Sequence, residues 1–310
     1  MMAPLIFVEA SDVCDVPPRA IVVVLDREGR LPDVDPRTCD AMITTAASPP
    51  APWTGIAPGR IEAQIARVTR AVARAPIAAT LLARVLRLTK HLKFDDALEV
   101  ESLAYSSLLG GVEFTSWLAA RKPATLEVSV PEVRYAREGD AVDLTLSDST
   151  TRNAITAAMR DALCEALENV LDDPSLPHVT LSGAGKCFST GGHLPEFGSQ
   201  RDLALAHMVR MERSPARLLA RLGTRAEVAL HGACIGSGIE IASAASRRVG
   251  APGTFVQLPE LAMGLIPGAG GTVTLPRAIG RHRTAWLTLG GFRLGAQQAL
   301  AWGLLQAIRP

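Results

Sequence analysis

Two acidic residues stand in segments that are otherwise apolar and rich in glycine. Glu240 belongs to residues 231–247 (HGACIGSGIEIASAASR), and Glu260 belongs to residues 257–271 (QLPELAMGLIPGAGG). A carboxylate in such a segment is costly unless it is paired or used. Two carboxylates around one water can divide the work of a general base and a general acid. Taken alone, Glu240 is equally consistent with an acid that stabilises the start of a helix.

Glycines in two segments can bring backbone N–H groups close to a ligand. Residues 182–196 (SGAGKCFSTGGHLPE) follow a predicted strand and contain four glycines, a composition that suits binding of an oxyanion or a phosphate. Tight packing is the more common reason for glycine in such a turn. Gly236, Ser237 and Gly238 open a predicted helix, whose first free N–H groups favour negative charge.

The elements that position these residues follow a long N-terminal region. Apolar runs at 5–9, 20–25 and 41–45 predict buried strands of a small sheet. Residues 48–59 (SPPAPWTGIAPG) contain four prolines and two glycines, so we expect a linker without regular structure. From residue 60 to residue 122, apolar residues recur every three or four positions, which predicts helices.

The first two of these helices have a lopsided charge. Their basic residues face a single acid, Glu62. A solvated helix face is the usual explanation, and a phosphate site is the alternative. The basic residues are Arg60, Arg67, Arg70, Arg74, Arg84, Arg87, Lys90 and Lys93.

The remainder of the chain mixes strands and helices. Alternating apolar residues on both sides of the turn at 138–140 predict a β-hairpin. A helix with its apolar face from Ile155 to Val170 and a strand at 178–183 (HVTLSG) follow, which indicates a mixed α/β domain. We expect three parts: a small α/β segment at 1–55, a helical segment at 56–123 and a catalytic core at 124–310.

Composition excludes several classes of protein. The 310 residues are 48% hydrophobic and 20% charged, and 32 Lys and Arg against 31 Asp and Glu give a net charge of +1. With only 4% aromatic residues, nucleic-acid binding is not expected, and the apolar fraction excludes disorder. Every apolar run is too short for a membrane span, so no membrane association is expected.

The cysteines and the N-terminus suggest a compartment. The five cysteines form no CxxC pair, so we expect free thiols in a reducing environment. The first ten residues are apolar but lack the basic region of a secretory signal, and we expect a cytoplasmic protein. The histidines show no metal-ligand spacing, so no metal is expected.

The three glycine-rich segments, in this order and spacing, resemble the crotonase (enoyl-CoA hydratase/isomerase) superfamily from about Val133 to the C-terminus. The hairpin matches the first family stretch. TTRNAIT, GAGKCFSTGG, GACIGSGIE, LPELAMGLIPGAGGT and LPRAIGRHRTAWLTLGGFRLGAQQALAWGLL match successive stretches that follow it. Six collinear matches carry the resemblance, since each one is short and glycine-rich.

This resemblance implies a fold and a chemistry. The fold is a crotonase-like spiral of β-β-α units that binds an acyl-CoA and stabilises the enolate of its thioester. By motif position, the backbone N–H groups of Gly192 and Ser237 form the oxyanion hole. Glu240 orients and deprotonates the attacking water, and Glu260 delivers a proton to Cα.

The resemblance also implies the substrate contacts and the assembly. Coenzyme A is part of the substrate and no separate cofactor is needed, and we expect a homo-oligomer, either a trimer or a hexamer. Ser237 replaces a frequent glycine, but the oxyanion hole needs only its N–H. The residues expected to bind substrate are Arg152, Asn153, Ala154, Thr190, Gly191, His193, Gly236, Pro267 and Gly268.

Two departures from the family pattern affect the expected site. His193 stands where the family commonly has Asp, and it could either contact an acyl substituent or hydrogen-bond locally. The C-terminal helices that usually close a crotonase site do not follow residue 310, so we expect residues 60–122 to replace them. Their expected packing groups are Leu103, Tyr105, Phe114, Trp117 and Leu118.

Three functions remain open at this stage. The leading one is hydration or dehydration of a 2-enoyl-CoA, because both acidic positions are filled. The second keeps the oxyanion hole but performs double-bond isomerisation, thioester hydrolysis or cofactor-free oxygenation of an aryl-acyl-CoA, since N-terminally extended crotonases include enzymes of aromatic acyl-CoA metabolism. The third is a non-catalytic acyl-CoA-binding subunit.

Overall fold

The N-terminal part of the chain forms a small parallel sheet. The computed structural model describes residues 4–12, 19–121 and 132–309. Strands run parallel in the order β1-β2-β3-β4, and all six residues of β2 are buried. The strands are β1 (Leu5–Glu9), β2 (Ile21–Asp26), β3 (Ala41–Thr44) and β4 (Thr54–Gly55).

The prediction that residues 48–59 contain no regular element was wrong at β4. Ile43 and Thr44 of β3 pair with Thr54 and Gly55, between the prolines of this segment. Trp53 is 5% exposed and packs with the apolar residues of the sheet. A two-residue edge strand fits between prolines because it needs few ladder hydrogen bonds.

Four helices follow the sheet between residues 61 and 119, which confirms that helices form within the stretch predicted at 60–122. Pro76 occupies the first position of the second helix, where its missing N–H costs nothing. Gly110 and Gly111 separate the last two helices. The helices are α1 (Ile61–Arg74), α2 (Pro76–Thr89), α3 (Phe94–Leu109) and α4 (Val112–Ala119).

Two sheets form the remainder of the molecule. The predicted hairpin is confirmed as the antiparallel edge of a six-stranded sheet with the order β13-β10-β8-β7-β6-β5, whose other pairs are parallel. Its strands are β5 (Glu132–Glu138), β6 (Ala141–Ser147), β7 (His178–Gly183), β8 (Ala226–Leu230), β10 (Arg247–Gly250) and β13 (Ala307–Ile308). The smaller sheet contains β9 (Ala233–Ile235), β11 (Phe255–Gln257) and β12 (Arg293–Gly295).

Helices cover and connect these sheets, so the expected mixed α/β fold class is confirmed. α5 begins at the N-cap Thr156, whose hydroxyl accepts a hydrogen bond from the N–H of Met159. The helices of this part are α5 (Ala157–Asp172), α6 (Leu203–Glu212), α7 (Pro215–Arg221), α8 (Ser237–Ala242), α9 (Gly271–Ile279), α10 (Arg281–Gly290) and α11 (Ala296–Ala301).

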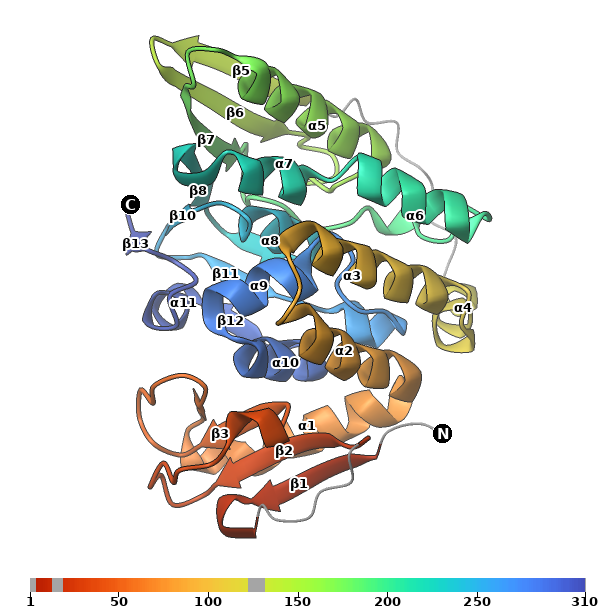
Figure 1. Cartoon of the computed structure of the whole chain (residues 1–310), viewed down its shortest axis with the longest axis vertical. Coiled ribbons are helices and arrows are strands. Elements are labelled where there is room, and N and C mark those ends of the chain that lie inside the picture. Colours follow the sequence, from red (N-terminus) through yellow and green to blue (C-terminus); the bar gives the residue numbers. More distant parts are fainter. Residues whose placement is uncertain (1–3, 13–18, 122–131, 310) are drawn as a thin grey trace.

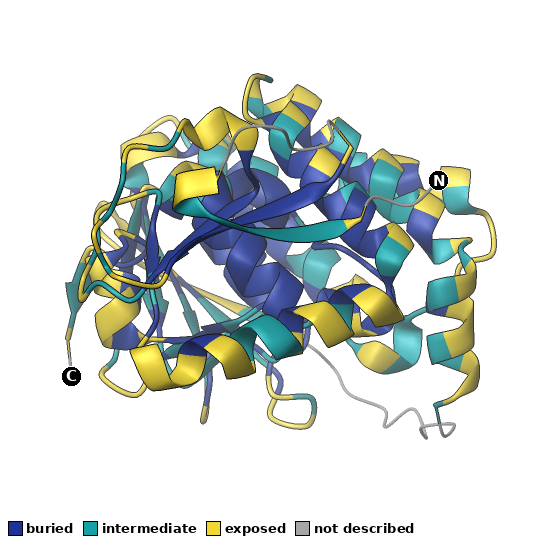
Figure 2. Ribbon diagram, turned by 90° about the horizontal axis from the view of Figure 1, so that it is seen from below, coloured by how far each residue is buried: buried dark blue, intermediate teal, exposed yellow. Residues whose placement is uncertain are grey.

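The N-terminal helices share a hydrophobic core with the C-terminal part. In Figure 1 the small sheet lies below α10, α1 runs at the level of the sheet, and α2 and α3 lie beside α9. Val68 of α1 and Leu82 of α2 belong to the same buried cluster as Leu265 and Trp286. Figure 2 shows this buried material running through the centre of the molecule. Leu103 is an exception to the expected packing groups, because it is half exposed on α3.

Other sequence expectations concern thiols, membranes and metals. Cys39, Cys164, Cys187 and Cys234 are buried free thiols, and Cys14 lies outside the described residues. Within the described ranges, no helix is long and apolar enough to cross a membrane. The same ranges contain no group of three or more His, Cys, Asp and Glu side chains placed to hold a metal ion.

Candidate active site

Three segments that are distant in sequence meet at one edge of the smaller sheet. Ser189 forms a bridge with Cys234 of β9, and the N–H of Ile235 donates to the Ser189 carbonyl at 3.1 Å. β11 pairs with β9 on its other side, and the N–H of Gly236 donates to the Gln257 carbonyl at 2.9 Å. The glycine loop after β7, the start of α8 and the segment that holds Glu260 therefore lie side by side.

Glycine is required at two positions of this junction. Gly191 has φ +88°, and a Cβ there would lie 2.6 Å from the Ile235 carbonyl oxygen. Gly236 has φ +49°, and a Cβ there would lie 2.8 Å from Oε1 of Glu260. Both the left-handed backbone and the close approach exclude a side chain. The glycines that the sequence singled out thus let two backbone turns and a carboxylate pack together.

The two expected oxyanion donors are neighbours at this junction. Ile155 pairs with the glycine loop through the carbonyl of Gly191 and the N–H of His193, so the N–H of Gly192 points away from that pairing. Ser237 is the first residue of α8, where helix geometry leaves N–H groups without intrahelical partners. A Cβ built on Gly192 would lie 3.9 Å from the Ser237 hydroxyl oxygen.

Glu240 is buried on α8 and is held by the loop that precedes α9. Its Oε2 accepts hydrogen bonds from the N–H groups of Ala269, at 2.7 Å, and Gly271, at 3.0 Å. Only 2% of the residue is exposed. Burial raises the pKa of Glu240 to about 7, although the backbone donors favour its charged form.

Glu260 opens a short 3-10 helix, Glu260–Met263, just after β11. Its Oε2 is buried and has no hydrogen-bond partner among the described residues. Burial and the nearby Glu240 carboxylate raise the pKa of Glu260 well above its ordinary value of 4.5. A buried carboxyl oxygen without a partner is rare in a folded protein and indicates a position that a ligand or water occupies.

A cavity of about 260 Å³ joins these groups. Both carboxylates and both expected oxyanion residues line it, and the buried hydroxyl of Ser237 has no hydrogen-bond partner in the described part of the chain. Of the residues expected to bind substrate, the cavity is lined by Thr190, Gly191, Gly236 and Gly268. The remaining five, which do not line it, are Arg152, Asn153, Ala154, His193 and Pro267.

Asn153 has a structural role that the sequence did not reveal. Its side-chain amide donates to the carbonyls of Ala184, Cys187 and Phe188, and its Oδ1 accepts from the N–H of Asp148. The side chain thus holds the glycine loop in place rather than facing the cavity. Because the side chain is used in this way, the predicted contact of Asn153 with substrate could involve only its backbone atoms.

His193 lines a neighbouring cavity of about 440 Å³ under α3, α4 and α6. Its Nδ1 is buried without a hydrogen-bond partner among the described residues, and it lies 3.7 Å from Oε1 of Glu196. Tyr105, Ile155 and Phe197 line both cavities. The position of His193 therefore suits contact with a group that extends from the first cavity into the second.

The N-terminal helices contribute two site residues that the sequence did not single out as chemical. Tyr105 of α3 lines the cavity, and its ring lies so close to Gly268 that a Cβ there would be 2.4 Å away. Glu101, one turn earlier on α3, is 2% exposed and accepts hydrogen bonds from the loop before α9. Burial raises its pKa to about 8, and Glu240 adds to that shift.

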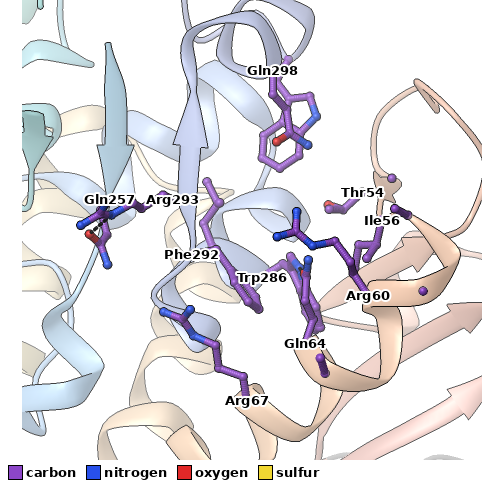
Figure 3. A pocket seen from close by; sticks show the side chains of 16 residues that line it. Thr54, Ile56, Arg60, Gln64, Arg67, Gln257, Trp286, Phe292, Arg293 and Gln298 are labelled. Carbon is purple, nitrogen blue, oxygen red and sulfur yellow. Dashed lines mark hydrogen bonds between the residues drawn. The ribbon is translucent and has the colours of Figure 1, made fainter. Parts of the chain in front are cut away.

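Two arginines on the basic face of the first two helices form hydrogen bonds with other parts of the chain. Arg87 donates to Asp40 at 2.8 and 2.6 Å, and Arg67 donates to the Gly291 carbonyl at 2.7 Å. Figure 3 shows Arg60, just before α1, and Gln64 and Arg67 of α1 on one side of a cavity of about 750 Å³, which shares no lining residue with the cavity around Glu240.

The sequence model of one family, described as enoyl-CoA hydratase/isomerase, matches residues 137–310. The chain belongs to the enoyl-CoA hydratase/isomerase family. The matched region contains Glu240, Glu260 and both expected oxyanion residues. The helix that carries both Glu101 and Tyr105, α3, precedes the matched region.

Relatives and solved structures agree with this family. The chain is 32% identical over 178 residues to the "Probable enoyl-CoA hydratase" of Bacillus subtilis (strain 168), and it covers 66% of that relative. It is 31% identical over 179 residues to the 2,3-dehydroadipyl-CoA hydratase of Escherichia coli (strain K12), with 58% of this chain and 69% of the relative covered. An enoyl-CoA hydratase from Thermoplasma volcanium GSS1 superimposes with a TM-score of 0.53 and 30% identity, over 57% of this chain and 71% of that one.

Proposed function

We propose that this family member adds water to, or removes water from, the double bond of a 2-enoyl-CoA thioester. The observation that carries the proposal is a pair of buried carboxylates on one cavity, Glu240 and Glu260, next to two backbone N–H groups and an unpartnered hydroxyl. The chain spans about two thirds of the length of the Bacillus subtilis relative described above. Both the activity and the substrate therefore belong to the proposal.

Glu240 acts as the general base in this mechanism. The N–H groups of Ala269 and Gly271 fix its Oε2, which leaves the other oxygen to orient a water toward Cβ of the substrate. A pKa of about 7 leaves a useful fraction ionised near neutral pH. As the water attacks, its proton passes to Glu240, and the electron pair of the double bond moves toward the thioester carbonyl.

Glu260 acts as the general acid, and the oxyanion hole stabilises the enolate. Burial and the nearby Glu240 carboxylate raise the pKa of Glu260 well above its ordinary value, which favours the protonated carboxyl that can deliver a proton to Cα. The N–H groups of Gly192 and Ser237 donate to the thioester oxygen as its charge develops. Donors aimed at developing charge in a dry cavity each contribute roughly 10²- to 10³-fold in rate.

Double-bond isomerisation is the second candidate. It needs a single carboxyl that takes a proton from one carbon and returns it to another, and Glu260 has a free buried oxygen for that task. Hydration is favoured because Glu240 is also placed on the cavity, and isomerisation does not need a second carboxylate.

The test is to incubate the full chain with aliphatic and aryl 2-enoyl-CoA esters and to follow the products by mass spectrometry. We expect a gain of one water with the thioester intact. Isomers of unchanged mass, free CoA, or the incorporation of molecular oxygen would each replace the proposal with the corresponding reaction. Binding of the esters without turnover would indicate the non-catalytic subunit.

A further inference from the structure

Residues 269–272, where the loop joins the first turn of α9, offer four consecutive backbone N–H groups, and two carboxylates share them alternately. The N–H groups of Ala269 and Gly271 donate to Glu240. Those of Gly270 and Thr272 donate to Glu101, both at 2.6 Å, and the hydroxyl of Thr272 adds a third bond to Glu101 at 2.7 Å. The loop is thus clamped from two sides.

The two carboxylates come from separate parts of the chain. Glu240 lies on α8 within the region that matches the family, and Glu101 lies on α3, before that region. Both are 2% exposed, so each depends on these donors in place of water. Tyr105 completes the clamp from α3 by packing its ring against Gly268 at the start of the loop.

We propose that Glu101 is a positioning residue that holds the loop at 268–272 in the conformation that fixes the Glu240 carboxylate. Glu101 accepts three short hydrogen bonds, at 2.6, 2.6 and 2.7 Å, and together they leave this segment little freedom. If the loop shifts, Oε2 of Glu240 loses its two donors. The other carboxylate oxygen of Glu240 then no longer orients the attacking water. This inference rests on the proposed function for its kinetic test but has a structural test of its own.

Electrostatics adds a consequence that packing alone would not produce. Charged and titratable groups approach Glu101 from several elements: Glu240 on α8, Glu260 beyond β11, Tyr105 on α3 and Arg210 on α6. Arg160 of α5 and Arg213, just after α6, line a small cavity together with Glu101. The charge of Glu101 helps raise the pKa of Glu260. Removing that charge therefore lowers the pKa of the proposed general acid.

The kinetic test compares Glu101→Gln with Asp96→Asn, which removes a carboxylate charge from an exposed position of the same helix. We expect Glu101→Gln to lower kcat by about 10- to 100-fold, the cost of a small misplacement of a catalytic group, while KM changes little. The alkaline limb of its pH profile should move to lower pH. Asp96→Asn should match the wild type. A wild-type kcat, or a reduced kcat with an unshifted profile, would overturn the inference.

The structural test needs no turnover, so its outcome is separate from that of the proposed function. Amide hydrogen exchange is measured for Ala269 and Gly271, which bond Glu240 and not Glu101. We expect at least ~10-fold faster exchange at both amides in Glu101→Gln and no change in Asp96→Asn, as for the loss of a buried hydrogen bond. Unchanged exchange would show that Glu101 does not hold the loop.

A less disruptive substitution tests the proposal if Glu101→Gln does not fold. Thr272→Val removes only the hydroxyl donor to Glu101 and keeps the N–H. We expect a several-fold rise in exchange at Ala269 and Gly271 and a several-fold fall in kcat with KM retained. Wild-type exchange at both amides would overturn the clamp.

Discussion

Glu240 and Glu260 are the residues on which the proposed chemistry depends most. We predict that Glu240→Gln and Glu260→Gln each lower kcat by at least ~10²-fold and leave the affinity for the CoA ester largely intact, because only acid-base catalysis is lost. Steady-state kinetics and isothermal titration calorimetry measure the two effects. If one variant turns over at nearly the wild-type rate, the role assigned to that glutamate is wrong.

Ser237 tests the oxyanion hole through its backbone. Ser237→Pro removes the N–H, whereas Ser237→Ala keeps it and removes only the hydroxyl. Because the N–H is the proposed donor, we predict that the proline variant loses at least ~10-fold more kcat than the alanine variant. Circular dichroism checks that both variants fold. Equal activities of the two folded variants would remove the Ser237 N–H from the mechanism.

The two carboxyl pKa values predict a bell-shaped pH profile. Glu240 must be ionised, so kcat/KM should fall as the pH drops below about 7. Glu260 must be protonated, so activity should also fall once the pH exceeds its raised pKa. Because the carboxyls interact, the apparent pKa of each limb describes the interacting carboxyls together and not one residue alone. An acid limb near 4.5, the ordinary value of a glutamate, would contradict the burial of Glu240 in the working enzyme.

At the level of elements, α1 presents two arginines for which the described ranges show no hydrogen bond or ion pair. Arg70 and Arg74 line a cavity of about 240 Å³, which shares Pro259 with the catalytic cavity. We predict that they contact the phosphates of CoA. Replacing both with Gln should raise KM by about 10-fold and weaken its dependence on salt, since contacts to phosphate are charge-assisted.

The control for this prediction is Arg84→Gln on α2, which is exposed and lines none of the cavities described. It should leave KM unchanged. Arg67 is kept, because its bond to the Gly291 carbonyl links α1 to the region after α10 and its loss would disturb packing. An unaltered KM in the double variant at low salt would show that this helix face is only solvated.

The functional residues that could be predicted from the sequence are those whose type differs from that of their neighbours. Glu240 and Glu260 are acids in apolar, glycine-rich segments, and both line the cavity. Glu101 was missed because α3 contains other acids and its charge looked ordinary. The available signal was spacing: Leu98, Glu101, Tyr105 and Leu108 follow one helical stripe, and both leucines on it are buried.

Other elements escaped prediction because tertiary contacts decide them. β4 forms between prolines since β3 offers an unpaired edge and Trp53 is buried with the sheet. Leu103 fits the apolar pattern of α3 but lies half exposed. Asn153 looked like a substrate contact, and only the structure shows its side chain bonded to three carbonyls of the glycine loop.

At the level of the whole molecule, the N-terminal helices and the family region depend on each other. We predict that a truncated chain beginning at residue 124 aggregates or loses its assembly and its activity. Residues such as Leu265 and Trp286 would no longer be covered by Val68 and Leu82. The newly exposed apolar surface would exceed the largest apolar patch of a typical soluble monomer, which is roughly a few hundred Å².

Size-exclusion chromatography with light scattering and the turnover assay measure this outcome. The full chain, handled identically, is the reference for both. A truncated chain that forms a uniform species with full activity would show the N-terminal part to be an independent appendage. The catalytic cavity would then not need Tyr105 from α3.

The most direct test of the central claim is a reaction with a 2-enoyl-CoA in water enriched in heavy oxygen. If Glu240 directs water to Cβ while Glu260 protonates Cα, the product is a 3-hydroxyacyl-CoA with the label on its hydroxyl and the thioester intact. Fragmentation in the mass spectrometer locates the label. A labelled carboxylic acid with free CoA, or an unlabelled isomer of the substrate, would contradict the proposed hydration.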